Sequence, residues 1–133
     1  MGNYHYEMAF RELVQDTEQR TGIELPWHIS NYLIVLLADR LDSVTFLPRN
    51  TYAESLLTIR DRSDAKTLGD NCLWVTGVFP DKSRPPRSYV TDIGRTAYTH
   101  CTHSYANREL FEQLSTHFEY IRDFVTHIIR DRV

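Results

Sequence analysis

Four polar residues in the middle of the chain are the first candidates for chemistry. Asp70 and Asp92 lie beside strongly apolar stretches, where a carboxylate without a partner is costly to bury, and Arg95 and His100 follow closely. Two interpretations stay open. The four side chains either form helix caps and salt bridges, or they line a polar pocket that binds a small ligand or a substrate.

Other catalytic and metal-binding patterns are weak or absent from the sequence. His100 and His103 are three residues apart, so a helix places both on one face, but two ligands do not make a metal site. The chain contains no His-Glu-x-x-His, no phosphate-binding glycine motif and no Gly-x-Ser-x-Gly. We therefore predict no metal, no cofactor and no catalytic residue, while an enzyme that uses the polar pocket remains an alternative.

A short basic segment suggests a second kind of binding. Residues 82–87 contain Lys82, Arg84 and Arg87 beside two consecutive prolines, and these side chains are suited to phosphates or to an acidic partner. A solvated loop is the simpler interpretation, because short charged loops are common and the net charge of the chain is −3. Nucleic-acid binding through this loop is therefore the last of the hypotheses.

Tyrosines of the same region suggest a protein interface. Tyr89, Tyr98 and Tyr105 are interpreted as one aromatic ridge along a single helix. A tyrosine has an apolar ring and a polar tip, which suits both a core and an interface between proteins. We predict that the chain forms a homodimer through this ridge.

The elements that position these residues are predicted to be helices. Apolar residues recur at helical spacing, no segment alternates as a strand does, and prolines and glycines separate the segments. The expected helices span residues 4–21, 27–42, 50–62, 64–79, 88–105 and 107–130. Ser88 is the expected cap of the fifth helix. The fold class is therefore all-α, a single-domain bundle of five or six helices over residues 1–133.

Composition places the chain among ordinary globular domains. Of the 133 residues, 41% are hydrophobic and 25% are charged, and 15 basic side chains oppose 18 acidic ones. Cys72 and Cys101 lie in no metal-binding spacing, which fits a reducing compartment. The longest apolar run, residues 32–38, is too short to cross a bilayer, and the first residues lack a signal-peptide pattern. We expect a cytoplasmic protein that does not contact membranes.

Three glycines fall inside predicted helices. Gly69, Gly77 and Gly94 should each cost about 1 kcal/mol relative to alanine. Close helix crossing explains such a cost, and so does a backbone opening at a binding site.

All three glycines belong to a longer pattern. Gly69-Asp70 precedes an apolar run that ends in Gly77 and Phe79, and Tyr89 and a Gly-Arg-Thr-Ala-Tyr block at 94–98 follow. The pattern resembles a family of small proteobacterial helical proteins whose activity is uncharacterised. The resemblance implies a helical bacterial cytosolic protein, and it brings no reaction, cofactor or assigned residue.

The leading functional hypothesis is a non-enzymatic interaction or regulatory module that self-associates and that has an unidentified protein partner. The alternative is a small-molecule-binding protein or enzyme with a polar pocket between the fourth and fifth helices.

Overall fold

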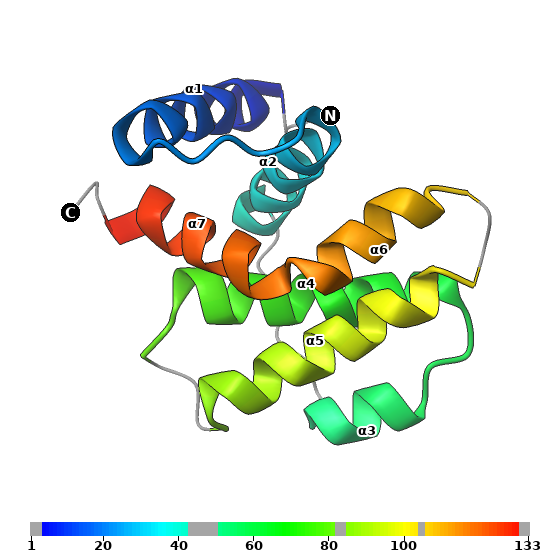
Figure 1. The fold of residues 1–133 in the computed structure, drawn as a ribbon. Helices are drawn as coiled ribbons and strands as arrows, with labels where there is room; N and C mark the ends of the chain where they lie inside the picture. The colour runs from blue at the N-terminus through cyan, green and yellow to red at the C-terminus, as the bar shows by residue number, and fades with distance from the viewer. Residues whose placement is uncertain (1–3, 43–50, 82–84, 104–105, 131–133) are drawn as a thin grey trace. The chain divides into compact units, whose positions relative to one another are not determined.

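All regular structure in the described part of the chain is helical. The computed structural model describes residues 4–42, 51–81, 85–103 and 106–130, and it contains seven helices in these ranges (Figure 1). They are α1 (Tyr4–Thr21), α2 (Trp27–Asp42), α3 (Tyr52–Leu57), α4 (Arg62–Val78), α5 (Arg87–Cys101), α6 (Arg108–Thr116) and α7 (Phe118–Arg130). The all-α prediction is confirmed, and the predicted number of helices is slightly too low. No helix in these ranges is long and apolar enough to cross a bilayer.

The chain divides into two compact units. One unit comprises Met1–Leu47 and His127–Val133, and the other comprises Pro48–Thr126. The prediction of one domain over residues 1–133 stays a prediction.

The first unit contains a hairpin of α1 and α2. Gly22, at a φ of +74°, ends α1 with a left-handed residue, and its N–H donates to the carbonyl of Glu18 (2.9 Å). The Glu18 carboxylate also accepts from the backbone N–H of Leu25 (2.9 Å), which fixes the connection to α2. Both helices have the bounds that periodicity predicts; α1 buries one stripe, whereas α2 buries residues on more than one side.

In the second unit, α4 packs along α5, and glycines allow the close approach. An added Cβ at Gly69 would lie 2.6 Å from the ring of Tyr98, and one at Gly94 would lie 2.6 Å from Phe118. At Gly77 a Cβ would lie 2.8 Å from Val125. Close helix crossing, one of the two explanations of these glycines, is therefore what the structure shows.

Several predicted helix bounds are wrong. The predicted helix 50–62 is only Tyr52–Leu57, because the capping box of Thr51 and Glu54 begins it and Thr58 ends it. The next helix begins at Arg62 rather than at 64, since the carboxylate of Asp61 caps it.

Later in the chain, α5 begins at Arg87 after Pro86, so Ser88 is not its cap. The predicted helix 107–130 is interrupted at His117. Its N–H still bonds to Gln113 (2.9 Å) and its carbonyl to Ile121 (2.9 Å), so the backbone ladder continues through the interruption. This continuity explains why one apolar periodicity runs through both α6 and α7.

Whether alanine at position 94 raises or lowers the free energy of unfolding tests the glycine contacts. In an open helix, Gly→Ala stabilises by about 1 kcal/mol. We expect Gly94→Ala instead to lower the free energy of unfolding by about 1–3 kcal/mol, because its Cβ would overlap Phe118 and Cys72. Urea denaturation measures this change, with the exposed Thr96→Ala as the matched control on the same helix. A stabilised Gly94→Ala protein would show that this face of α5 has room.

Candidate functional site

Asp70 is the one member of the predicted polar set that lies in the crossing of α4 and α5. Its carboxylate is 6% exposed; one oxygen accepts from the Tyr98 hydroxyl (2.6 Å), and the other pairs with Lys66 (3.0 Å). The short O–H···O distance is typical of a charge-assisted hydrogen bond. Asp70 is therefore a buried acid with both carboxylate oxygens bonded, as the salt-bridge interpretation predicts.

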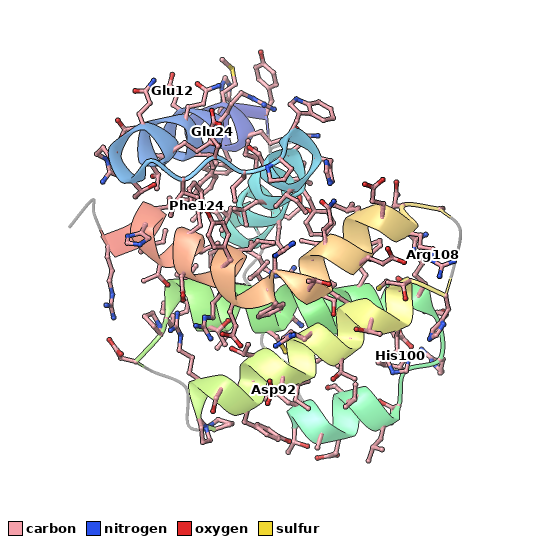
Figure 2. The ribbon with its side chains drawn as sticks, in the orientation of Figure 1. Glu12, Glu24, Asp92, His100, Arg108 and Phe124 are labelled. Carbon is pink, nitrogen blue, oxygen red and sulfur yellow. The ribbon has the colours of Figure 1, made fainter. Side chains whose placement is uncertain are left out.

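The other three members lie elsewhere on α5. Asp92 and His100 are exposed; Asp92 lies in the first half of the helix and His100 next to its C-terminal end (Figure 2). Arg95 lies between them and pairs with Glu119 (3.5 Å). The four residues therefore do not form the common pocket that the sequence suggested.

The two cysteines are buried and hold their protons. Burial raises the pKa of Cys72 from 9.0 to about 12 and that of Cys101 to about 11. At Cys101 the positive charges of Arg62 and Lys66 oppose this rise, and the negative charge of Asp70 adds to it. Neither thiol is a nucleophile at neutral pH, because the thiolate is the reactive form.

The interpretation of the tyrosines as one ridge is wrong at Tyr98. Tyr98 is fully buried, whereas Tyr89 on the same helix is 41% exposed. Nine residues at about 100° each leave these two side chains half a turn apart, so they face opposite ways. Tyr105 lies outside the described residues. Tyr89 and Tyr98 therefore do not form one surface, and the homodimer stays a prediction.

The basic segment is only partly described. Lys82 and Arg84 lie outside the described residues. Arg87 donates from Nε to the carbonyl of Thr76 (3.0 Å) and from Nη2 to the carboxylate of Asp123 (3.3 Å). Its guanidinium thus joins α4, α5 and α7 within the second unit, which is a structural role rather than that of a free phosphate-binding cation.

The described residues contain no complete metal site around the two histidines. The rings of His100 and His103 are 6.0 Å apart between centroids, but α5 ends at Cys101 rather than at 105, so His103 does not share a helix face with His100. In residues 4–42, 51–81, 85–103 and 106–130, no group of three potential ligands could hold an ion.

The strongest candidate site is a pocket between α3 and α4. Its volume is about 400 Å³, within the range of ordinary ligand pockets. The α4 residues that line the pocket stand at positions i, i+3, i+4 and i+7, so one face of this helix forms a wall. The lining residues from α3 and the turn after it stand at positions i, i+3 and i+6. The lining residues are Tyr52, Ser55, Thr58, Arg60, Asp64, Thr67, Leu68 and Asn71.

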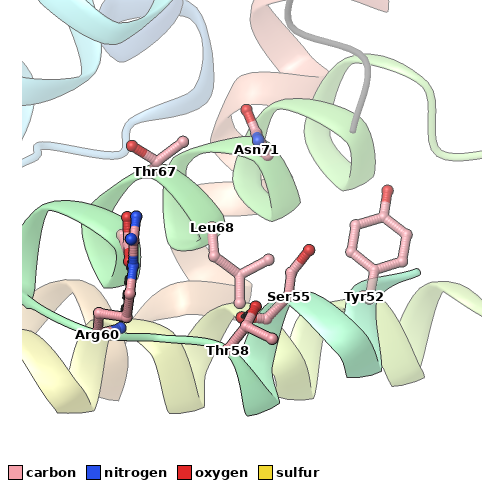
Figure 3. Close-up of a pocket in the computed structure, with 8 residues that line it drawn as sticks. Tyr52, Ser55, Thr58, Arg60, Thr67, Leu68 and Asn71 are labelled. Carbon is pink, nitrogen blue, oxygen red and sulfur yellow. Dashed lines mark hydrogen bonds and ion pairs between the residues drawn. The ribbon is translucent and has the colours of Figure 1, made fainter. Parts of the chain in front are cut away.

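The two ends of the pocket differ in charge. Figure 3 shows Arg60 at one end and Tyr52 at the other, with Asn71 nearer to Tyr52. Asp64 accepts from the backbone N–H of Arg60 (3.1 Å) and from its Nε (3.3 Å), so these charges are paired. The Tyr52 end contains only uncharged polar groups.

Several polar groups of the pocket have unused hydrogen-bonding capacity. The Oδ1 atom of Asn71 is buried and accepts no hydrogen bond from the described residues. An unsatisfied buried acceptor costs about 1–3 kcal/mol. The lining side chains that make no hydrogen bond to any described residue are those of Tyr52, Ser55, Thr67 and Asn71.

Tyr52 is held in its neutral form. Half-burial raises the pKa of its hydroxyl, and the electrostatic interaction with Cys72 adds to the rise. The hydroxyl therefore keeps its proton at neutral pH and can donate a hydrogen bond.

The sequence carries one signal for this pocket. Asp64, Thr67 and Asn71 recur at helical spacing on α4. The same pattern is typical of a solvated helix face, and only the placement of α3 beside α4 distinguishes the two. The pocket thus lies on a different side of α4 from the one that the sequence suggested.

Comparison of the chain with family models, with curated proteins and with solved structures finds no match. The resemblance to the proteobacterial family therefore stays a prediction, and function has to be argued from the geometry alone.

The raised thiol pKa values predict how stability depends on pH. Above about pH 9 the thiols of the unfolded chain lose their protons, while the native thiols keep theirs to about 11 and 12. The unfolded state then binds fewer protons, so the free energy of unfolding falls as the pH rises above 9 and is unaffected by these groups below it. Urea denaturation across this range measures the slope.

The control for this slope is the double variant Cys72→Ala/Cys101→Ala. Its free energy of unfolding at each pH is compared with its own value at pH 8. We expect a shallower fall in the variant than in the native chain. An equal fall in both proteins would assign the effect to other groups.

Proposed function

We propose that this protein is a non-enzymatic regulatory module that binds a small polar ligand in the pocket between α3 and α4. The observation that carries the proposal is one pocket lined by four polar side chains that make no hydrogen bond to any described residue, those of Tyr52, Ser55, Thr67 and Asn71. A ligand with hydrogen-bond donors and acceptors would engage them. As the sequence resemblance implies, we place this module in the bacterial cytoplasm.

The charges of the pocket favour binding over catalysis. A general acid or base must reach the substrate with a proton to give or accept. The carboxylate of Asp64 is engaged with Arg60, and Cys72 beside Tyr52 is a protonated thiol. The unengaged side chains are hydroxyls and an amide, which bind without transferring a proton at neutral pH.

The binding proposal is tested by nuclear magnetic resonance on the whole chain. We expect at least one of glucose, adenosine, glycine and inorganic phosphate to shift the backbone amides of residues 52–58 and 64–71 in a saturable way. Asn71→Ala should weaken that binding by about tenfold, the effect of losing one hydrogen bond from its amide. Thr96→Ala, on the exposed face of α5, should not change it. Amides that no probe moves would contradict the proposal.

A second candidate function is self-association through the first unit. Trp27 is 76% exposed and lines a groove of about 260 Å³ between α1 and α2. Arg11 and Glu18 lie seven residues apart on the α1 side of this groove. In a two-fold dimer, Arg11 of one copy would face Glu18 of the other, and the exposed indole would be covered. We propose a second copy of the chain as the occupant.

The dimer proposal predicts a change of mass. Trp27→Ala should weaken self-association by at least about tenfold, because a buried tryptophan is a typical interface hot spot. Sedimentation at several concentrations measures this. The control is Tyr120→Ala, which removes a half-exposed aromatic residue of the second unit and should leave the mass unchanged. A native chain that stays monomeric, or equal masses for the native and Trp27→Ala chains, would overturn the proposal.

A further inference from the structure

The pocket between α3 and α4 offers no net charge to a ligand. Its two charged side chains, Arg60 and Asp64, neutralise each other at one end, with 3.3 Å between Nε and the carboxylate oxygen. Arg60 is 85% exposed, so water screens this pair, and the other lining residues offer an ionic ligand no further charge to bind. The pocket therefore favours a neutral ligand.

The unengaged groups can both donate and accept hydrogen bonds. The hydroxyls of Tyr52, Ser55 and Thr67 each have one donor and acceptor lone pairs, and the Asn71 amide has both kinds of group. The Thr58 hydroxyl differs, since it donates to the carbonyl of Glu54 (2.8 Å). Groups that both donate and accept hydrogen bonds are matched by a ligand whose atoms do the same. Hydroxyl groups on a ligand have this property.

The pocket also has an apolar surface. Leu68, only 5% exposed, lies among the polar lining residues, and the ring of Tyr52 lies at one end. A sugar or cyclitol presents C–H groups on one side and hydroxyls at its edge, so it can contact both kinds of surface. A flat aromatic ligand would use the apolar surface and leave several hydroxyls of the pocket without partners.

We propose that the ligand is a neutral polyhydroxylated molecule of the size of a monosaccharide. This inference rests on the proposed function, because it names the class of ligand that the same pocket would take. The hydroxyls of Ser55 and Thr67, one from each helix, and the Asn71 amide would hold the ring edge.

Two matched sets of probes test the ligand class. Glucose and myo-inositol are the neutral probes, and glucose 6-phosphate, inorganic phosphate and glycine are the charged ones. Amide shifts of residues 52–58 and 64–71 of the full chain report binding. We expect glucose or myo-inositol to bind, and glucose 6-phosphate to bind at least about tenfold more weakly than glucose.

The double variant Ser55→Ala/Thr67→Ala removes one hydroxyl from each wall without removing a hydrogen bond between described residues. It should weaken neutral binding by at least about tenfold, while Thr96→Ala should not. A double variant that binds glucose as the native chain does would overturn the assignment. Its unfolding curve, compared with that of the native chain, shows that the fold is retained.

The outcomes separate this inference from the proposed function. Binding of the charged probes alone, or of adenosine alone, at these amides would overturn the polyhydroxylated class and leave a ligand-binding pocket. Absence of any shift with every probe would overturn both.

Discussion

The hydrogen bond from Tyr98 to Asp70 is the interaction on which the second unit depends. It joins residues 28 positions apart, at a distance of 2.6 Å, within the crossing of α4 and α5. The Tyr98 ring reaches the carboxylate because it lies directly on Gly69, where any side chain would displace it. A glycine, a buried acid and a buried tyrosine thus depend on one another. The loss of any one would leave a polar atom unpaired or open a gap in the crossing.

This constraint also explains which face of α4 is available for binding. The α4 residues that meet α5 and α7 include Gly69, Cys72 and Gly77, and they leave no room for a ligand. Asp64, Thr67 and Asn71 lie on another face of the same helix, where the short α3 approaches. The crossing holds α4 in place, and the candidate pocket forms on the side that the crossing does not use.

The sequence predicts local structure better than it predicts the site. Periodicity gives the correct bounds of α1 and α2, because the apolar residues of each helix recur at helical spacing, which reflects local geometry. The contact of Tyr98 with Asp70 joins two helices, and no spacing rule indicates it. Nor does spacing separate the Thr67 and Asn71 stripe from a solvated face, because the difference depends on where α3 packs. Pocket position is a tertiary property, and the sequence shows only the residues available to form it.

The two walls of the pocket differ in stability, since α4 is well packed and α3 is not. Ligand binding would therefore affect how firmly α3 is held. α4 has 17 residues and is buried along much of its length, whereas α3 has six residues, none of them buried. A helix of six residues is not stable alone, so α3 depends on its capping box and on packing against α4 and α5. A ligand held by Ser55 and Thr67 would add a connection between the two walls. Binding would therefore stabilise the position of α3 by mass action, which gives a small ligand a means to change the surface that α3 presents to a partner.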